Sequence, residues 1–442
     1  MLRKHNVLKP LCLREESGIK LPFTNRGEEL KELAGVARSG GLAIVFGRRR
    51  VGKTRLFTHW IKPQNGLYSQ AIEAASAIQI EQVMSDIGQA LDTIIVPKTW
   101  NELLELLSLK KGPTILCLDE FPYLVASDAS LPSVIRRWLD HRQPEQFTLV
   151  LSGSSTSAMN HLFLNRAAPL YQRARKLLHI EPMSYRAFCE ACGIPLGGMD
   201  SFTRFSLVGG IPKYWEFVEP RATALDLADE LFFGRSAFLE DEPARILRDE
   251  KIAGLPALSV LEAVGRGAHR TSEIAARIGT AQTNLSHVLQ RLMDASVLAR
   301  SIPFGESMRS TKKTCYQIQD PAMRFCFHVY SPHRTRWHAY AKAEKEKLIH
   351  DHASTVFEDY CRAQYPGPHA IGKETSNLIL FAMRTAARWY RRSSLSAFPR
   401  PKNGESKIIW LLAGNRAACI GGLAKSPLKS WMFPCLVESG SP

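Results

Sequence analysis

The sequence lacks the features that mark a secreted or membrane-spanning protein. Its nine cysteines are scattered without the spacing of a disulfide framework, which favours a reducing compartment. No uninterrupted apolar run approaches the roughly 18 residues that a membrane-spanning helix needs. No apolar block of secretory-signal length follows the first basic residues. We therefore expect a cytoplasmic protein that does not contact membranes.

Acidic residues are scarce at the end of the chain. From Cys361 onward there are twelve Lys and Arg, three Glu and no Asp, in a chain whose net charge is +16. A nuclease centre needs several carboxylates to hold its metal, so the tail disfavours one. The only carboxylate–x–basic run of note, Glu405-Ser406-Lys407, lies in polar sequence and is interpreted as chance. We interpret the tail as a degenerate or frame-shifted basic end.

Apolar strands alternate with helical patterns in the first 180 residues. Continuous apolar runs predict buried strands at 42–46, 114–118 and 147–151. Helical spacing fills much of the chain between them. This alternation is typical of an α/β fold with a parallel sheet. After residue 180 the pattern becomes mostly helical.

A phosphate-binding motif lies between the first predicted strand and the helix after it. The sequence GRRRVGKT matches G-x-x-x-x-G-K-[ST] in full. In such a loop the backbone N–H groups and the helix N-terminus bind phosphate oxygens. We expect Lys53 to reach the β- and γ-phosphates and the Thr54 hydroxyl to ligate Mg²⁺. The side chains of Arg49 and Arg50 are expected to point to solvent. The predicted ATP site comprises Gly47, Arg48, Arg49, Arg50, Val51, Gly52, Lys53 and Thr54.

Polar residues end the next two predicted strands. Asp119 and Glu120 follow the strand at 114–118, and Ser154 follows the strand at 147–151. Carboxyl ends of parallel strands face the ligand, so these residues should lie near the phosphates. We expect Asp119 to hold Mg²⁺ and Glu120 to activate the attacking water. Ser154 could contact the γ-phosphate, or it could belong to a simple turn that caps the next helix.

A catalytic arginine is also expected, because extra negative charge develops on the phosphoryl oxygens in the transition state. The candidates are Arg173 and Arg175, beyond the third predicted strand, and we choose Arg173. An ordinary surface role is the alternative for both. Cys189 and Cys192 form a lone CxxC, which we interpret as one turn of a half-buried helix and not a zinc site.

Seven segments, in order, resemble the archaeal-type ATPase family, a branch of P-loop NTPases close to AAA+ and STAND ATPases. The resemblance covers about residues 20–335. It implies that Arg26 and Glu29 pack near the nucleotide base, that Arg173 lies in the family's arginine segment, and that a helical lid follows the core. The segments are FTNRGEEL, GRRRVGKT, LDEFPYL, LSGSS, APLYQRA, VGGIPKYW and KKTCYQIQDPAMRFCF.

Residues 254–320 read as a helix-turn-helix followed by a hairpin, the pattern of a winged helix. The helix at 281–298 would present five polar side chains outward, and the hairpin tip carries three cations. DNA binding through this module and a packing role are both open. The outward residues are Gln282, Asn284, His287, Gln290 and Arg291, and the cations are Arg309, Lys312 and Lys313.

We predict an α/β P-loop NTPase core with a helical lid and a winged-helix domain. The expected activity is hydrolysis of Mg-ATP that rearranges the lid and winged helix, by a chain that could form a homo-oligomer. The alternative is a nucleotide-gated signalling or scaffold module with negligible turnover. The predicted segments are a lead-in (1–20), the ATPase core (21–180), the lid (181–250), the winged helix (251–335) and a linker helix with the basic tail (336–442).

Overall fold

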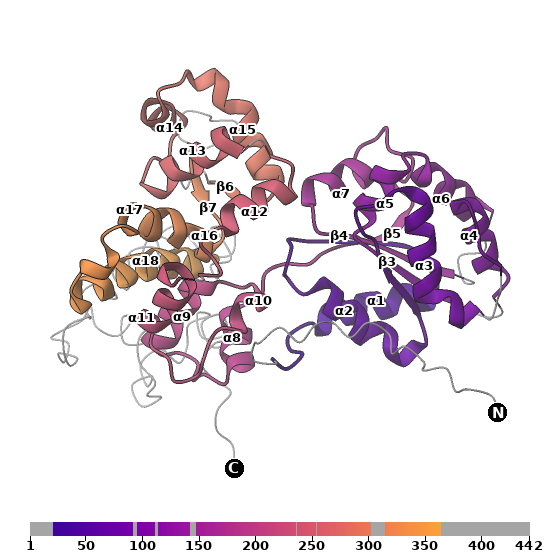
Figure 1. Cartoon of the computed structure of the whole chain (residues 1–442), viewed down its shortest axis with the longest axis horizontal. Coiled ribbons are helices and arrows are strands. Elements are labelled where there is room, and N and C mark those ends of the chain that lie inside the picture. The colour runs from indigo at the N-terminus through magenta and orange to yellow at the C-terminus, as the bar shows by residue number, and fades with distance from the viewer. Residues whose placement is uncertain are drawn as a thin grey trace, which may run out of the picture.

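The computed structural model describes residues 21–91, 95–110, 114–141, 147–235, 237–252, 254–301 and 314–363. Figure 1 shows the α/β core on one side and the helices from α8 onward on the other. Predictions for the basic tail, including Glu405 to Lys407, and for the cations Arg309, Lys312 and Lys313 lie outside the described residues. Among the described helices, none is both long and apolar enough to cross a membrane.

A five-stranded parallel sheet forms the core, in the order β2-β3-β4-β1-β5. The mixed α/β fold with a parallel sheet is therefore confirmed. The three predicted strands are its central ones, and the two edge strands β2 and β5 were not predicted. The strands are β1 (Gly41–Phe46), β2 (Leu67–Gln70), β3 (Thr114–Asp119), β4 (Phe147–Gly153) and β5 (Ala174–His179).

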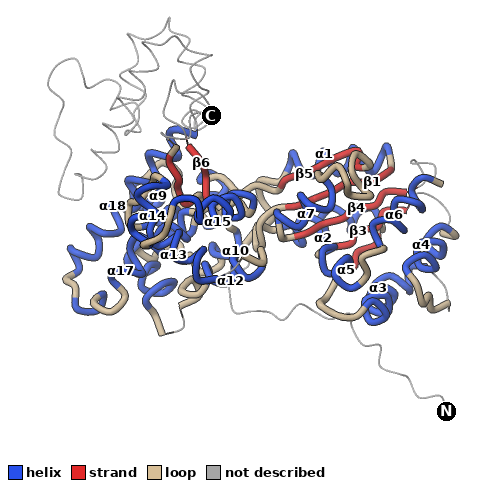
Figure 2. The backbone as a smooth tube through the Cα atoms, turned by 90° about the horizontal axis from the view of Figure 1, so that it is seen from above, coloured by secondary structure: helices blue, strands red, loops and turns tan. Residues whose placement is uncertain are grey.

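Helices lie above and below this sheet in Figure 1 and cover both of its faces, whereas Figure 2 looks onto the strands from above. Because side chains alternate along a strand, Ala43 and Val45 of β1 join one apolar cluster while Leu42 and Ile44 join another. On the first face lie α1 (Gly27–Ser39) and α2 (Lys53–Ile61), with a short turn at Lys62–Gln64. On the second face lie α3 (Ser76–Leu91), α4 (Trp100–Ser108), α5 (Phe121–Ser127), α6 (Leu131–Asp140) and α7 (Thr156–Phe163).

The first cluster continues from the sheet into a group of mostly short helices. His352 of the long α18 is fully buried there and donates through Nε2 to the main-chain oxygen of Ser206 on α9, 2.9 Å away. Cys189 and Cys192 are both buried on α8, and burial raises the pKa of the Cys192 thiol to about 12. The helices and turns are α8 (Tyr185–Cys192), α9 (Met199–Val208), α10 (Pro212–Trp215), α11 (Ala224–Ala228), Asp229–Phe233, α16 (Pro321–Phe325), Cys326–Tyr330, α17 (Ser331–His333), Trp337–Ala339 and α18 (Lys342–Ala363).

A third cluster belongs to a separate unit, which we call the 242–318 unit. Three helices and an antiparallel strand pair enclose it, and α12 adds Ile246 and Leu247 from one side. Met323 and Phe327, just beyond the strand pair, complete the cluster. Its elements are α12 (Glu242–Asp249), α13 (Gly254–Gly265), α14 (Thr271–Ile278), α15 (Gln282–Asp294), β6 (Leu298–Ser301) and β7 (Cys315–Ile318).

Candidate nucleotide site

The phosphate loop follows β1 and leads directly into α2, which begins at Lys53. Gly52 has a left-handed backbone (φ 99°), which favours glycine. At Gly47 an added Cβ would lie 2.5 Å from the Ile180 main-chain oxygen, so no larger residue fits there. The two glycines of the motif thus permit a tight loop at the carboxyl end of the central strand.

Lys53 lies inside this loop with only 5% of its surface exposed. Its ammonium group donates to the main-chain oxygens of Gly47 at 2.7 Å and Arg48 at 3.3 Å. Burial lowers the pKa of Lys53, and three nearby carboxylates, those of Glu120, Asp119 and Glu250, act in the opposite direction. A buried cation with only carbonyl partners is a position suited to an anionic ligand.

Asp119 ends β3 and lies opposite the start of α2. Its Oδ2 accepts hydrogen bonds from the Thr54 hydroxyl at 2.8 Å and the Tyr68 hydroxyl at 3.1 Å. Burial raises the pKa of Tyr68, so this phenol remains a donor. The Thr54 and Asp119 oxygens are hard donors of the type that Mg²⁺ prefers, so the donor set fits the expected metal. Tyr68 was missed by the sequence reasoning because its strand, β2, was not predicted.

Glu120 and Ser154 meet at the same edge of the sheet. Glu120 has a left-handed backbone (φ 55°), an uncommon conformation for a residue with a side chain. Its Oε2 accepts from the main-chain N–H of Ser154 at 3.2 Å and from the Ser154 hydroxyl at 2.8 Å. The cap of the next helix, α7, is Ser155 and not Ser154. The two residues predicted to serve the water and the γ-phosphate are therefore brought together.

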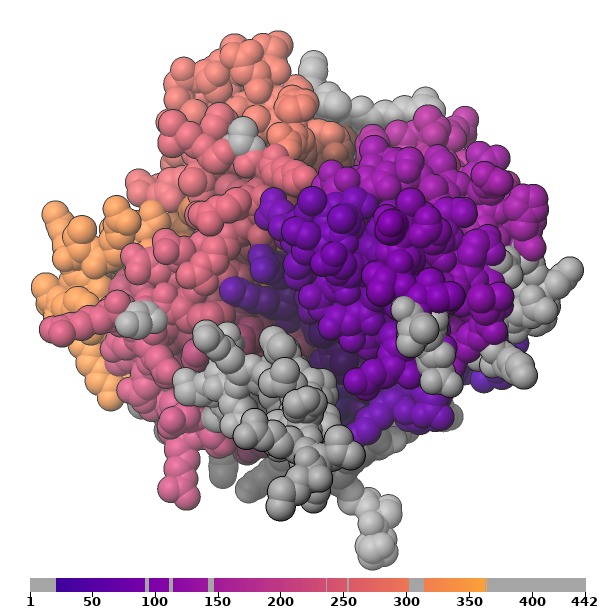
Figure 3. All heavy atoms as spheres, turned by 45° about the vertical axis from the view of Figure 1, so that its right-hand side comes forward, coloured from indigo at the N-terminus to yellow at the C-terminus, as the bar shows by residue number. Residues whose placement is uncertain are grey.

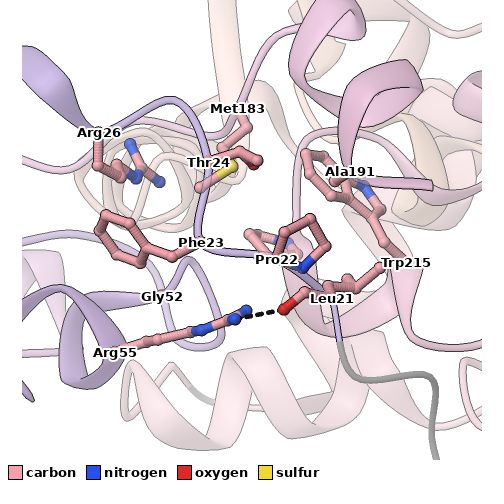
Figure 4. A pocket seen from close by; sticks show the side chains of 11 residues that line it. Leu21, Pro22, Phe23, Thr24, Arg26, Gly52, Arg55, Met183, Ala191 and Trp215 are labelled. Atoms are coloured by element: carbon pink, nitrogen blue, oxygen red, sulfur yellow. Dashed lines mark hydrogen bonds between the residues drawn. The ribbon is translucent and has the colours of Figure 1, made fainter. Parts of the chain in front are cut away.

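A pocket of about 350 Å³, including its open mouth, lies beside the phosphate loop at Gly52. Figure 4 shows Phe23, Thr24 and Arg26 from the segment before α1 on one side, with Met183 and Trp215 facing them. Arg26 lines this pocket, pairs with Glu29 at 2.6 Å and donates to the Val51 main-chain oxygen at 2.9 Å. The segment that the resemblance associates with the nucleotide base is thus next to the phosphate loop.

The turn at Gly209 and Gly210 brings the residues that follow α9 to this pocket. Gly209 has a positive φ (59°), and a Cβ on Gly210 would lie 2.3 Å from the Met183 main-chain oxygen. The turn is followed by Pro212 and Trp215, and both line the pocket. Gly209 is therefore favoured by its positive φ, and Gly210 by the close approach of the Met183 main chain.

The expectation that Arg49 and Arg50 point to solvent is wrong for Arg50. Its side chain is 23% exposed, pairs with Glu242 of α12 and lies over the Phe238 ring, 4.8 Å from the centroid. Arg49 is 56% exposed, yet both of its carboxylate contacts, to Asp249, are at 2.7 Å. These acidic partners lie on α12, about 200 residues further along the chain. The sequence of the phosphate-binding motif does not indicate such distant partners.

Arg48 is the most buried of the three loop arginines. It pairs with Asp320 and donates to the Tyr214 hydroxyl at 3.3 Å. Burial acts to lower the pKa of Arg48, but nearby acidic groups, above all the charge of Asp320 and its hydrogen bond, outweigh it, and the net pKa is raised. The guanidinium therefore stays charged and paired.

Arg173 does not lie at the nucleotide site of its own chain. It precedes β5, whose first residue Ala174 pairs with Leu42 at the start of β1, whereas the phosphate loop follows the other end of β1. Arg173 instead pairs with Asp140 at 2.7 Å. Arg175 also lies at the far edge and donates to the Ser39 main-chain oxygen at 2.9 Å. Both arginines lie at the start of β5. Because β5 is parallel to β1, its start lies beside the start of β1, away from the phosphate loop that follows the end of β1.

The fold and the site define a P-loop NTPase. Residues 23–217 match a family model described as an ATPase domain predominantly from Archaea. This match confirms the resemblance to the archaeal-type ATPases expected from the motifs. An uncharacterized protein of Methanocaldococcus jannaschii is 27% identical over 314 residues, which are 70% of this chain and 69% of the relative.

Solved structures of similar fold include a Walker-type ATPase of Pyrococcus abyssi. It is 16% identical with a TM-score of 0.51, and the match covers 69% of this chain and 96% of that one. The ORC2 protein of Aeropyrum pernix matches over 74% of this chain and 98% of its own, with 12% identity and a TM-score of 0.44. The likeness to the first structure supports the P-loop NTPase fold of the described residues.

Proposed function

We propose that this chain binds ATP with Mg²⁺ at the phosphate loop and hydrolyses it. The observation that carries the proposal is the convergence of Thr54, Asp119, Glu120 and Ser154 at the mouth of a loop that holds a buried lysine. A phosphate-binding loop alone would suit any nucleotide-binding protein. A base placed beside the phosphate site is what hydrolysis requires in addition.

Each residue has a role in this proposal. Lys53 exchanges its carbonyl partners for phosphate oxygens, and the phosphate chain lies along the N–H groups of the loop. Thr54 and Asp119 would hold Mg²⁺, which neutralises charge on the phosphoryl oxygens when bound. Glu120 accepts the proton of the attacking water, and Ser154 fixes the direction of its carboxylate. The purine base of the nucleotide would lie in the pocket between Phe23 and Trp215.

The test is phosphate release by the wild type and by Glu120→Gln, with nucleotide affinity measured in parallel. We expect Glu120→Gln to bind ATP with similar affinity and to lose on the order of 10²–10⁴-fold in turnover. Lys62→Gln is the control, because Lys62 is exposed on the turn after α2. Equal, near-zero rates in the wild type and Glu120→Gln, with ATP bound, would exclude hydrolysis.

That outcome would support the second candidate, a nucleotide-gated signalling or scaffold module. One observation favours it: Glu120 is already bonded to both donors of Ser154, so the base is held by its own chain. In such a module nucleotide binding alone would change the arrangement of the lid and the 242–318 unit.

DNA is the proposed partner of the 242–318 unit, which we interpret as a winged helix. Gln282, Asn284 and His287 are exposed on α15, in line with a groove-reading helix. Arg291 is used differently, because it donates to the Lys251 main-chain oxygen. Duplex binding should weaken with rising salt if this proposal holds. Absence of binding at both low and moderate salt would exclude it.

A further inference from the structure

Three adjacent arginines of the phosphate loop each pair with a different carboxylate from the second half of the chain. Arg48 pairs with Asp320, Arg49 with Asp249 and Arg50 with Glu242. Glu242 also accepts from the Tyr214 hydroxyl at 2.7 Å, and Asp320 from the main-chain N–H of Met323 at 2.7 Å. These are not isolated surface pairs, because Asp320 is 7% and Glu242 9% exposed at the side chain.

A fourth carboxylate from the same region lies at the other side of the nucleotide site. Glu250, directly after α12, is 6% exposed and rests on the N-terminus of α7. It accepts from the hydroxyls of Ser155 and Ser157, each at 2.9 Å, and from the Thr156 main-chain N–H at 3.0 Å. We call Glu242, Asp249, Glu250 and Asp320 the acidic latch.

Glu250 is within electrostatic reach of the bound phosphates. Lys53, which would contact the β- and γ-phosphates, is influenced by the charges of Glu120, Asp119 and Glu250. Glu250 is bonded to the residues that directly follow Ser154, the proposed γ-phosphate contact. A γ-phosphate therefore brings further negative charge to a place where three carboxylates already act on one ammonium group. Asp119 and Glu120 belong to the sheet core, whereas Glu250 belongs to the end of α12.

The acidic latch contacts the core through charged side chains, whereas residues 181–217 contact the core through apolar side chains. Lid residues such as Phe188 and Trp215 share one apolar cluster with the sheet. By contrast, Ile246 and Leu247 of α12 belong to the cluster of the 242–318 unit, and α12 meets the phosphate loop through charged side chains. Figure 3 shows these two parts of the molecule abutting along one face. A polar interface of this kind is readily separated and salt-sensitive.

We propose that the acidic latch is a γ-phosphate-sensitive lock. It holds α12 on the phosphate loop when the site is empty or contains a diphosphate. A triphosphate repels Glu250 from α7, and α12 then leaves the loop together with the 242–318 unit. The loop arginines are exposed by the same movement. This inference rests on the proposed nucleotide binding and gives it a direction: the triphosphate state is the open one.

The experiment measures amide hydrogen exchange of α12 in the full-length protein without nucleotide, with ADP, and with a non-hydrolysable ATP analogue. We expect slow exchange in the first two states and at least tenfold faster exchange with the analogue. Glu250→Gln removes the charge and keeps an acceptor, so it should tighten binding of the analogue about five- to tenfold and change ADP binding less than twofold. Asp294→Asn is the matched control, because among the described residues the Asp294 side chain accepts from Gln290 of the same unit and has no hydrogen bond or ion pair with the core.

A charge exchange provides a second test of the pairing. Asp249→Arg should speed exchange of α12 in the absence of nucleotide, and combining it with Arg49→Asp should restore slow exchange. The lock is overturned if α12 exchanges equally in all three states although both nucleotides bind. It is also overturned if Glu250→Gln shifts both affinities equally. If neither nucleotide binds the wild type, the proposed function fails together with the lock, so the two failures are distinguishable.

Discussion

Ser154 and Glu120 directly follow two neighbouring strands, β4 and β3, and both hydrogen-bond donors of Ser154 reach the same oxygen of Glu120. The left-handed backbone of Glu120 costs roughly 1–2 kcal/mol for a residue with a side chain. The hydrogen bonds from Ser154 offset part of that cost and fix the direction of the carboxylate. The carboxylate of Glu120, the proposed general base, is therefore oriented by the chain itself.

Ser154→Ala should lower turnover about tenfold to a hundredfold, since it removes one donor that orients Glu120 and could serve the γ-phosphate. The affinity for ATP should change less than about threefold, because the loop and Lys53 remain. Steady-state phosphate release and equilibrium binding separate the two effects. Ser127→Ala is the control, as its hydroxyl donates to the Leu124 main-chain oxygen within its own helix. Unchanged turnover in Ser154→Ala would remove Ser154 from the site.

Lys53→Met should bind ATP at least about a hundredfold more weakly and yet fold more stably. The ammonium group of Lys53 is buried with main-chain oxygens as its hydrogen-bond partners, and burial lowers its pKa. Replacing such a cation with an apolar side chain of similar length often stabilises a protein by about 1–2 kcal/mol. Urea unfolding without nucleotide measures this, with Lys62→Met as an exposed control. A destabilised Lys53→Met would contradict the prediction.

Gly210→Ala should destabilise the protein by about 2–4 kcal/mol, because its Cβ would lie 2.3 Å from a main-chain oxygen that cannot move independently. Gly35→Ala is the matched control, since nothing lies within 4 Å of its Cβ position on α1. There the change should stabilise by about 0.5–1 kcal/mol through helix propensity. Thermal unfolding of both variants and the wild type measures the two changes in stability. Equal effects would mean that the close approach at Gly210 is absent.

His352 should make the protein less stable as the pH falls. Burial lowers the pKa of His352 from 6.5 to about 3, although its bond to Ser206 acts to raise it. Between these values the unfolded chain binds a proton that the folded chain does not, so the free energy of unfolding falls with decreasing pH. The slope approaches about 1.4 kcal/mol per pH unit well below pH 6.5.

His352→Gln keeps a donor for the Ser206 oxygen and removes the titration. The slope of unfolding free energy between pH 6 and about pH 4 should therefore be shallower than in the wild type, by up to the same 1.4 kcal/mol per unit. His161→Gln, an exposed histidine on α7, should leave the slope unchanged. Identical slopes for His352→Gln and the wild type would contradict this.

Arg173 can act on a nucleotide only if that nucleotide is bound by a second copy of the chain. If it does, the inactive variants Arg173→Ala and Glu120→Gln should restore activity when mixed, because one copy supplies the base and the other the arginine. Activity per chain of the wild type should also rise with protein concentration. Mass measurement with an ATP analogue would detect the assembly. If the mixture is as inactive as its components, Arg173 does not act on the nucleotide of a second copy, and its role is the ion pair with Asp140.

The central strands could be predicted because they are buried on both faces, so their apolar runs are continuous. The edge strands could not be predicted. Tyr68 and Ser69 dilute the apolar signal in β2, and three of the six residues of β5 are Arg, Lys or His. The place of Arg173, away from the phosphate loop of its own chain, could not be predicted for the same reason. If β5 is not recognised, nothing in the sequence indicates whether Arg173 lies at the start or at the end of the parallel strands.

The phosphate loop, Asp119, Glu120 and Ser154 could be predicted because a strand ends beside each of them, and parallel strands end at one edge. The acidic latch could not be predicted by the same reasoning. Glu242 and Asp249 have the spacing of an ordinary solvated helix face, and their partners lie about 200 residues away. Such pairings are decided by the docking of separate units and not by local pattern.

The apolar cluster on the first face of the sheet includes both Leu21 and Val356, close to the two ends of the described chain. It therefore cannot be completed during synthesis until almost all of the described residues have left the ribosome. Until α18 arrives, the surface on α9 that receives His352 remains uncovered. Folding of the sheet and of the helices that share this cluster is thus coupled to the late part of translation, and a chain cut before α18 would expose an apolar face to aggregation.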